Sequence, residues 1–139
     1  MHDLCTYDYA IIRVVPKVER EEFVNVGVIL SCPAKGFLEA RVELDEQRLK
    51  SLDKTLDIES IQSHLASMTA ICAGGEAAGP IGRLSQRERF HWLTAPRSTI
   101  IQTSAVHTGH TTDPALVLEH VLDSAVRSPR EESPRQPPA

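Results

Sequence analysis

Several signals that would direct a chain to a membrane, to secretion or to nucleic acid are missing from these 139 residues. The first residues, MHDLCTYDYAII, contain neither a basic leader nor a long apolar run. No stretch of the chain approaches the roughly 18 apolar residues of a membrane-spanning helix. The formal net charge is -4, so general attraction to nucleic acid or to anionic membrane is not expected. We therefore expect a cytoplasmic protein.

Motifs that fix a metal or a reaction are also missing. The three cysteines, Cys5, Cys32 and Cys72, are widely spaced and form no CxxC pair, which favours reduced thiols over disulfides or a thiolate zinc site. The chain has no GxSxG nucleophile elbow and no GxxxxGK[ST] phosphate loop. We therefore expect no metal and no cofactor, and we name no catalytic residue.

The composition is that of one ordinary globular domain followed by a polar tail. With 41% hydrophobic and 24% charged residues, 139 residues are enough for one domain with a real core. The last twelve residues, SPREESPRQPPA, contain four prolines and four charged residues but no large apolar group. Such a segment cannot bury enough surface to fold, so we predict a domain over 1–127 and a disordered tail over 128–139.

Alternation of apolar and polar residues predicts three consecutive strands, Tyr7–Val15, Phe23–Ser31 and Phe37–Leu44. The links between them are short, which favours an antiparallel meander. In the second strand, one continuous apolar face is expected to hold Val24, Val26, Val28 and Leu30.

A fourth strand and several helices are predicted after this meander. Ser98–Val106 is rich in threonine and isoleucine, as strands are. Helix-capping residues precede apolar residues at three- and four-residue spacing, and the caps are Asp45, Asp57, Ser85 and Asp113. We expect an α+β domain of two layers, with about four mainly antiparallel strands and the helices packed on one face.

A polar sheet face is the first candidate site. Strand phase places Arg13, Asn25 and Arg41 opposite the valines, and the same phase adds Gly27, Glu39 and Glu43. One interpretation is a solvated face with cross-strand ion pairs. The other is a binding surface, because glycine within a strand often marks the close approach of a backbone or ligand. Tyr9, Ile11 and Ile29, predicted on this face, suggest that something covers part of it.

Three further residues complete the candidate set. Glu22, in the loop before the second strand, is placed to reach Arg13. Arg97 follows Pro96 in a constrained loop and is a better anion contact than the arginines of the preceding helix, where Phe90 and Trp92 are expected in the core. His107, ahead of the last helix, is a hydrogen-bonding or proton-transfer candidate. The candidate binding residues are Arg13, Glu22, Asn25, Arg41, Arg97 and His107.

Two blocks of the chain together resemble one bacterial family. They are YDYAIIRVVPKVEREEFVNVGVIL and RFHWLTAPRSTIIQTSAVHTGHTTDP. In this order they look like the paired signatures of the domain of unknown function family 3037, over roughly residues 5–126. The resemblance implies no catalytic residues. It does imply a possible protein partner, because members resemble accessory proteins encoded beside HipA-type kinases.

Two functional hypotheses follow. The first is a non-enzymatic binding or accessory module that engages a protein partner or a small anion through the polar sheet face and the Arg97–His110 region. The alternative is an enzyme acting on a phosphate-containing substrate. In that enzyme Arg13, Arg41 and Arg97 would clamp the anion, Asn25 would orient it, and His107 or Glu22 would move protons. The enzyme requires these side chains to converge on one concave pocket.

Overall fold

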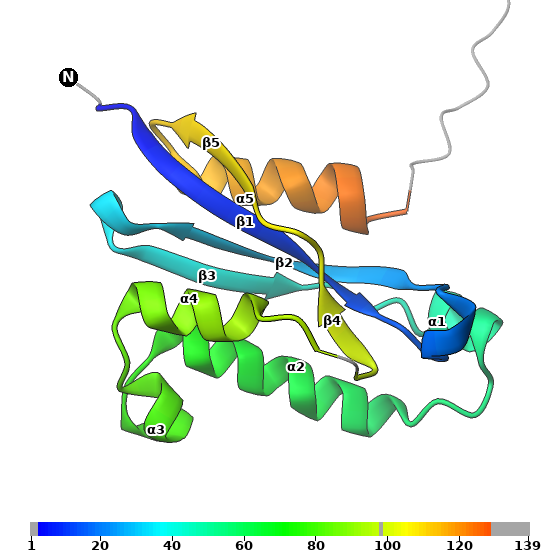
Figure 1. Cartoon of the computed structure of the whole chain (residues 1–139). Coiled ribbons are helices and arrows are strands. Elements are labelled where there is room, and N and C mark those ends of the chain that lie inside the picture. The colour runs from blue at the N-terminus through cyan, green and yellow to red at the C-terminus, as the bar shows by residue number, and fades with distance from the viewer. Residues whose placement is uncertain (1–2, 98, 129–139) are drawn as a thin grey trace, which may run out of the picture.

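The computed structural model describes residues 3–97 and 99–128 and shows one antiparallel sheet with helices (Figure 1). The five strands are β1 (Cys5–Val14), β2 (Val24–Cys32), β3 (Phe37–Val42), β4 (Ile101–Thr103) and β5 (His107–Thr111). The order is β3-β2-β1, and β4 and β5 both pair with the far edge of β1. The predicted α+β class and the N-terminal meander are confirmed.

The helices are α1 (Glu46–Leu52), α2 (Ile58–Ala73), α3 (Gly79–Gly82), α4 (Gln86–Thr94) and α5 (Pro114–Val121), which continues as the π-helical turn η4 (Leu122–Val126). All of these except α3 begin where the sequence predicts. Short 3₁₀ turns are η1 (Val18–Arg20), η2 (Pro33–Lys35) and η3 (Glu76–Ala78). The four predicted caps, Asp45, Asp57, Ser85 and Asp113, each accept a backbone N–H of the first turn.

Helices cover both faces of the sheet. Residues of α1 to α4 pack with one face in a large apolar cluster that includes Leu49, Leu65 and Leu93. Helix α5 and η4 lie on the opposite face, where Leu118 and Leu122 form a second cluster with β2 (Figure 1). The prediction that the helices pack on one face therefore holds for α1 to α4 but not for α5. The molecule has three layers.

A β-bulge in β2 explains how the second core arises. Ile12 pairs with Gly27 and Arg13 pairs with Asn25, so Val26 is an extra residue without a partner in β1. A bulge of one residue shifts the alternation of side chains between the two faces.

The predicted continuous apolar face of β2 is wrong for this reason. Val24 belongs to the cluster beneath α2, whereas Val28 and Leu30 belong to the cluster beneath α5. Gly27 and Ile29, predicted on the polar face, lie on the α2 side instead. A Cβ on Gly27 would be 2.7 Å from the Arg41 backbone oxygen, so glycine is required where β3 approaches closely.

The predicted strand Ser98–Val106 is shorter than expected and is followed by another. Ser98 lies outside the described residues, and β4 covers only Ile101–Thr103. Ser104 interrupts the ladder, and its hydroxyl accepts the Ile11 N–H at 2.8 Å. The segment from His107, for which no strand was predicted, pairs with β1 as β5. Gly109 permits this, because a Cβ there would meet the Tyr7 hydroxyl at 2.4 Å.

The described residues test two predictions about the whole chain only in part. In the described part of the chain, no helix is both long and apolar enough to cross a membrane. The predicted disordered tail, apart from Ser128, lies outside the described residues.

Candidate functional site

Asn25 and Arg41, the centre of the predicted polar face, contact the last helix. The Asn25 side-chain amide donates to the Ala125 carbonyl oxygen at 3.0 Å. An Arg41 guanidinium nitrogen lies 2.5 Å from a Glu119 carboxylate oxygen. The surface that strand phase predicted for a ligand is thus the surface on which α5 and η4 rest.

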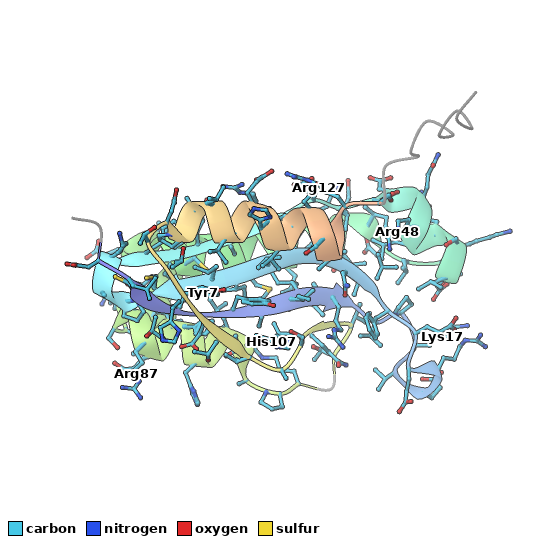
Figure 2. The ribbon with its side chains drawn as sticks, turned by 90° about the horizontal axis from the view of Figure 1, so that it is seen from above. Tyr7, Lys17, Arg48, Arg87, His107 and Arg127 are labelled. Carbon is cyan, nitrogen blue, oxygen red and sulfur yellow. The ribbon has the colours of Figure 1, made fainter. Side chains whose placement is uncertain are left out.

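An ion-pair network strengthens this attachment. Arg127 lies 2.8 Å from Glu43 on the end of β3 and 2.5 Å from Glu119 on α5. Figure 2 shows Arg127 and Arg48 together at the C-terminal end of this helix, where Arg48 donates to the Val126 carbonyl oxygen at 3.1 Å. Hydrogen bonds from Arg127 lower the pKa of both the Glu43 and the Glu119 carboxyl. These charges fasten the helix to the sheet.

Arg13 has a different environment. Its guanidinium carbon lies 4.1 Å from the centre of the Phe23 ring, which is 45% exposed. Among the described residues, no carboxylate lies within ion-pair distance of Arg13, and its buried Nε has no hydrogen-bond partner. The buried Oδ1 of Asn25, its partner across the two strands, is also without a donor in this part of the chain. Arg13 is therefore a half-buried cation with an unused hydrogen-bond donor.

Glu22 does not contact Arg13 in the structure. Its carboxylate pairs with Arg20 in the same exposed loop. This pair raises the pKa of the Arg20 guanidinium, chiefly through the hydrogen bond to Glu22. An ion pair exposed to solvent contributes little to stability or to a site.

Arg97 and Trp92 form a second arginine–aromatic pair. The Arg97 guanidinium carbon lies 4.3 Å from the Trp92 ring centre, and its Nη2 donates to the Trp92 carbonyl oxygen at 2.6 Å. Trp92 is 39% exposed, so its predicted place in the core is wrong, whereas Phe90 is buried as predicted. Positions 90 and 92 are two residues apart on α4 and so face nearly opposite directions. This two-residue spacing was the signal in the sequence that could have placed Trp92 on the surface once Phe90 was assigned to the core.

His107 lies on β5 and not at the start of a helix. Its ring stacks on Tyr9 with the centres 5.1 Å apart, and Tyr9 in turn stacks on Tyr7 at 6.2 Å. Figure 2 shows Tyr7 and His107 on the part of the sheet that α5 leaves uncovered. His107 is exposed there, beside the exposed Val106.

The anion clamp required by the enzyme hypothesis does not form. Arg41 is engaged by Glu119, and Arg13 and Arg97 each stack on a different aromatic ring. Of five hollows of about 230 to 560 Å³ on the described surface, one is lined by Arg97 and none by the other five candidate residues. We therefore retain no catalytic assignment for these residues.

The two buried cysteines lack the lowered pKa of a catalytic thiol. Burial raises the pKa of the Cys72 thiol to about 12 and also raises that of Cys32, so neither is an activated nucleophile. Within residues 3–97 and 99–128, no three histidine, cysteine or carboxylate side chains gather as metal ligands would.

The two arginine–aromatic pairs are linked through Gln102 on β4, a strand at the edge of the sheet. Arg13 on β1 pairs with Gln102 on β4, and partners across antiparallel strands project to the same face. Gln102 also lines the hollow of about 230 Å³ that contains Arg97 and Val106. We call this surface the arginine–aromatic edge, and its residues are Arg13, Phe23, Trp92, Arg97, Gln102 and Val106. The sequence pointed to the two arginines but not to the aromatic rings on which they stack.

These features define a small α+β protein in which one antiparallel sheet separates two helical layers. Residues 9–126 match the family model described as Protein of unknown function (DUF3037), so the chain belongs to that family. The resemblance predicted from the two sequence blocks is confirmed. No curated protein and no solved structure matches the chain.

Proposed function

We propose that this protein is a non-enzymatic binding module that engages an acidic segment of a protein partner through the arginine–aromatic edge. One observation carries the proposal. Arg13 and Arg97 each stack on a partly exposed aromatic ring, and no carboxylate of the described residues is within ion-pair distance of either. In a chain of net charge -4, such cations are the natural contacts for an acidic partner.

The chemistry of these pairs supports recognition of carboxylates. An arginine lying flat on an aromatic ring keeps the edge of its planar guanidinium available for a carboxylate, while the ring limits its rotamers. Tryptophan and arginine are also enriched among the residues that contribute most to protein–protein affinity. By contrast, Arg41 and Arg127 are already neutralised by Glu119.

The shape of the edge favours a protein surface over a drug-sized small molecule. Its hollow of about 230 Å³ is smaller than the roughly 300 to 1,000 Å³ of typical small-molecule pockets. Its exposed apolar groups, Phe23, Trp92 and Val106, come from three separate segments of the chain. Spread apolar contacts with arginines between them are typical of protein interfaces. His107, next to Val106, lies at the border of the same surface.

The proposal narrows the region predicted from the sequence. Asn25 and Arg41 hold α5 and are not free to bind a partner. The proposed binding surface therefore excludes the rest of the polar sheet face and consists of Arg13 and the Arg97–His110 region. The resemblance to accessory proteins makes a HipA-type kinase of the same bacterium the first partner to test.

The test compares charge-reversed variants against the purified kinase and in pull-downs from the native host. Arg97→Glu should reduce the affinity about tenfold or more, because it replaces an attraction to carboxylates with a repulsion. Lys50→Glu makes the same change of charge at an exposed position of α1, a helix that contributes no residue to the edge, and should leave the affinity unchanged. If Arg97→Glu and Arg13→Ala both bind as the unmodified protein does, the arginine–aromatic edge is not the binding surface. A protein that repeatedly purifies alone and binds no kinase would contradict the proposal as a whole.

A further inference from the structure

The outer edge of β3 is an unpaired strand whose charges are self-complementary. β3 pairs with β2 on one side only, and in the described structure no strand pairs with its other side. Its sequence is FLEARV, with Glu39 and Arg41 on either side of Ala40. An exposed strand edge of this kind is a template for pairing with another chain unless it is blocked by proline, lysine or a bulge, and β3 has none of these.

The backbone groups of β3 are arranged for such pairing. The Glu43 N–H donates to the Val26 carbonyl oxygen at 2.8 Å, toward β2. Because successive residues of a strand direct their N–H and C=O groups to opposite sides, the groups of Leu38, Ala40 and Val42 point away from β2. In the described structure no strand uses these donors and acceptors. Leu38 and Val42 are partly exposed, whereas Ala40 is 5% exposed, so pairing at Ala40 requires the side chains that cover it to move aside.

We propose that β3 pairs with β3 of a second copy of this chain, antiparallel about a twofold axis at Ala40. In this register Ala40 faces Ala40 of the second copy, and its N–H and C=O form the central pair of hydrogen bonds. Leu38 then faces Val42 of the other copy. Both are apolar side chains only partly buried against the α2 side of the sheet, so pairing removes more of their surface from water.

Charge selects a second copy over other strands. Glu39 faces Arg41 of the other copy, and Arg41 faces its Glu39, so the twofold axis produces two opposite-charge pairs on the α5 face. Glu39 is 45% exposed, and Arg41 keeps 37% of its side chain exposed although it also contacts Glu119. Within one chain these residues already attract each other at 3.5 Å, and Glu119 holds Arg41 near the edge. A parallel arrangement in the same register would instead place like charges opposite each other.

This dimer would be weak and would combine two sheets into one. Pairing over a single short strand buries less area than a standard stable interface. We therefore expect a dissociation constant in the micromolar range. The dimer would carry an arginine–aromatic edge at each outer end of the joined sheet, so it would present two partner sites. The inference does not depend on the proposed function, because the two surfaces lie at opposite edges.

Sedimentation of the purified full-length chain from about 5 to about 500 µM tests the pairing. The unmodified protein should shift from monomer to dimer over this range. Ala40→Pro removes an N–H that points away from β2, and should abolish the dimer without breaking a bond to β2. Thr108→Pro introduces a proline on β5, at the other edge of the sheet. This variant is the matched control and should still dimerise. A protein that stays monomeric throughout, or a dimer that survives Ala40→Pro, would overturn the inference.

A mixing experiment tests the register. Glu39→Arg should weaken self-association about tenfold or more, because two arginines then face each other. Arg41→Glu should do the same with two carboxylates. An equimolar mixture of the two variants should recover a heterodimer, in which each arginine faces a carboxylate. Arg41→Glu also loses its contact with Glu119, so circular dichroism is used to check that this variant remains folded. If it does not, the register is judged from Ala40→Pro and Glu39→Arg alone. Dimerisation of Glu39→Arg as strong as that of the unmodified chain would exclude this register.

Discussion

The Asn25 side-chain amide donates a hydrogen bond to the Ala125 carbonyl oxygen, 3.0 Å away and 100 residues later in the sequence. This bond joins the residue before the bulge of β2 to the π-helical turn at the end of α5. Carbonyl groups at the end of a helix lack partners within the helix, so a side-chain donor there stabilises the end. Asn25 therefore has a structural role in holding the third layer of the molecule.

Replacing Asn25 with alanine should destabilise the fold modestly. The variant loses one hydrogen bond to a part-buried carbonyl group, which typically contributes about 1 kcal/mol to the free energy of unfolding. Urea denaturation monitored by circular dichroism measures the change. Ser124→Ala, on the exposed side of the same turn, is the control and should change the free energy by less than about 0.5 kcal/mol. An unchanged stability in Asn25→Ala would show that the bond to Ala125 contributes nothing.

The attachment of α5 should weaken in acid. Hydrogen bonds from Arg127 lower the folded-state pKa of Glu43 and of Glu119 below the usual 4.5. Carboxyl groups with a lowered folded pKa stabilise the fold above their unfolded pKa, and this contribution is lost as the pH falls through the folded pKa. Stability should therefore fall as the pH drops below about 4.5. Arg127→Ala should be less stable at neutral pH and should show a flatter pH dependence in urea titrations. A parallel pH dependence in both proteins would contradict the coupling.

Gly27→Ala should destabilise the domain more than most single substitutions. The new Cβ would lie 2.7 Å from the backbone oxygen of Arg41, and neither strand can move without disturbing the bulge. Overpacking of this kind costs about 1 to 3 kcal/mol. Gly36→Ala is a useful comparison, since nothing lies within 4 Å of its Cβ and only its positive φ of 59° opposes the change. Thermal unfolding of the two variants should rank Gly27→Ala as the less stable.

The single tryptophan should report directly on the arginine–aromatic edge. Because Trp92 is 39% exposed, acrylamide should quench its fluorescence in the folded protein, and Arg97→Ala should increase the quenching by uncovering the ring. Binding of the partner should protect the same ring. Arg83→Ala, which removes an exposed arginine near Glu76, is the control and should leave quenching unchanged. A folded protein whose tryptophan resists acrylamide would place Trp92 in the core, contrary to the structure.

Local sequence determined most of the secondary structure. Alternation located the three strands of the meander, and the caps Asp45, Asp57, Ser85 and Asp113 located four helix starts, because both signals depend on neighbours only a few residues apart. The two sequence blocks were also enough to identify the family, as the match over residues 9–126 confirms. The arginines at 13 and 97 were likewise identified as candidate contacts from the sequence.

The tertiary structure decided which surface each residue occupies. The bulge at Val26 reverses the phase of β2, and strand alternation alone does not reveal a bulge, because the extra residue exists only relative to the pairing with β1. The same pairing divides the apolar residues of β2 between two cores and places α5 over Asn25 and Arg41. The partners of Arg13 and Arg97 were decided in the same way, since Phe23 and Gln102 come beside Arg13 only when the loop and β4 pack against β1.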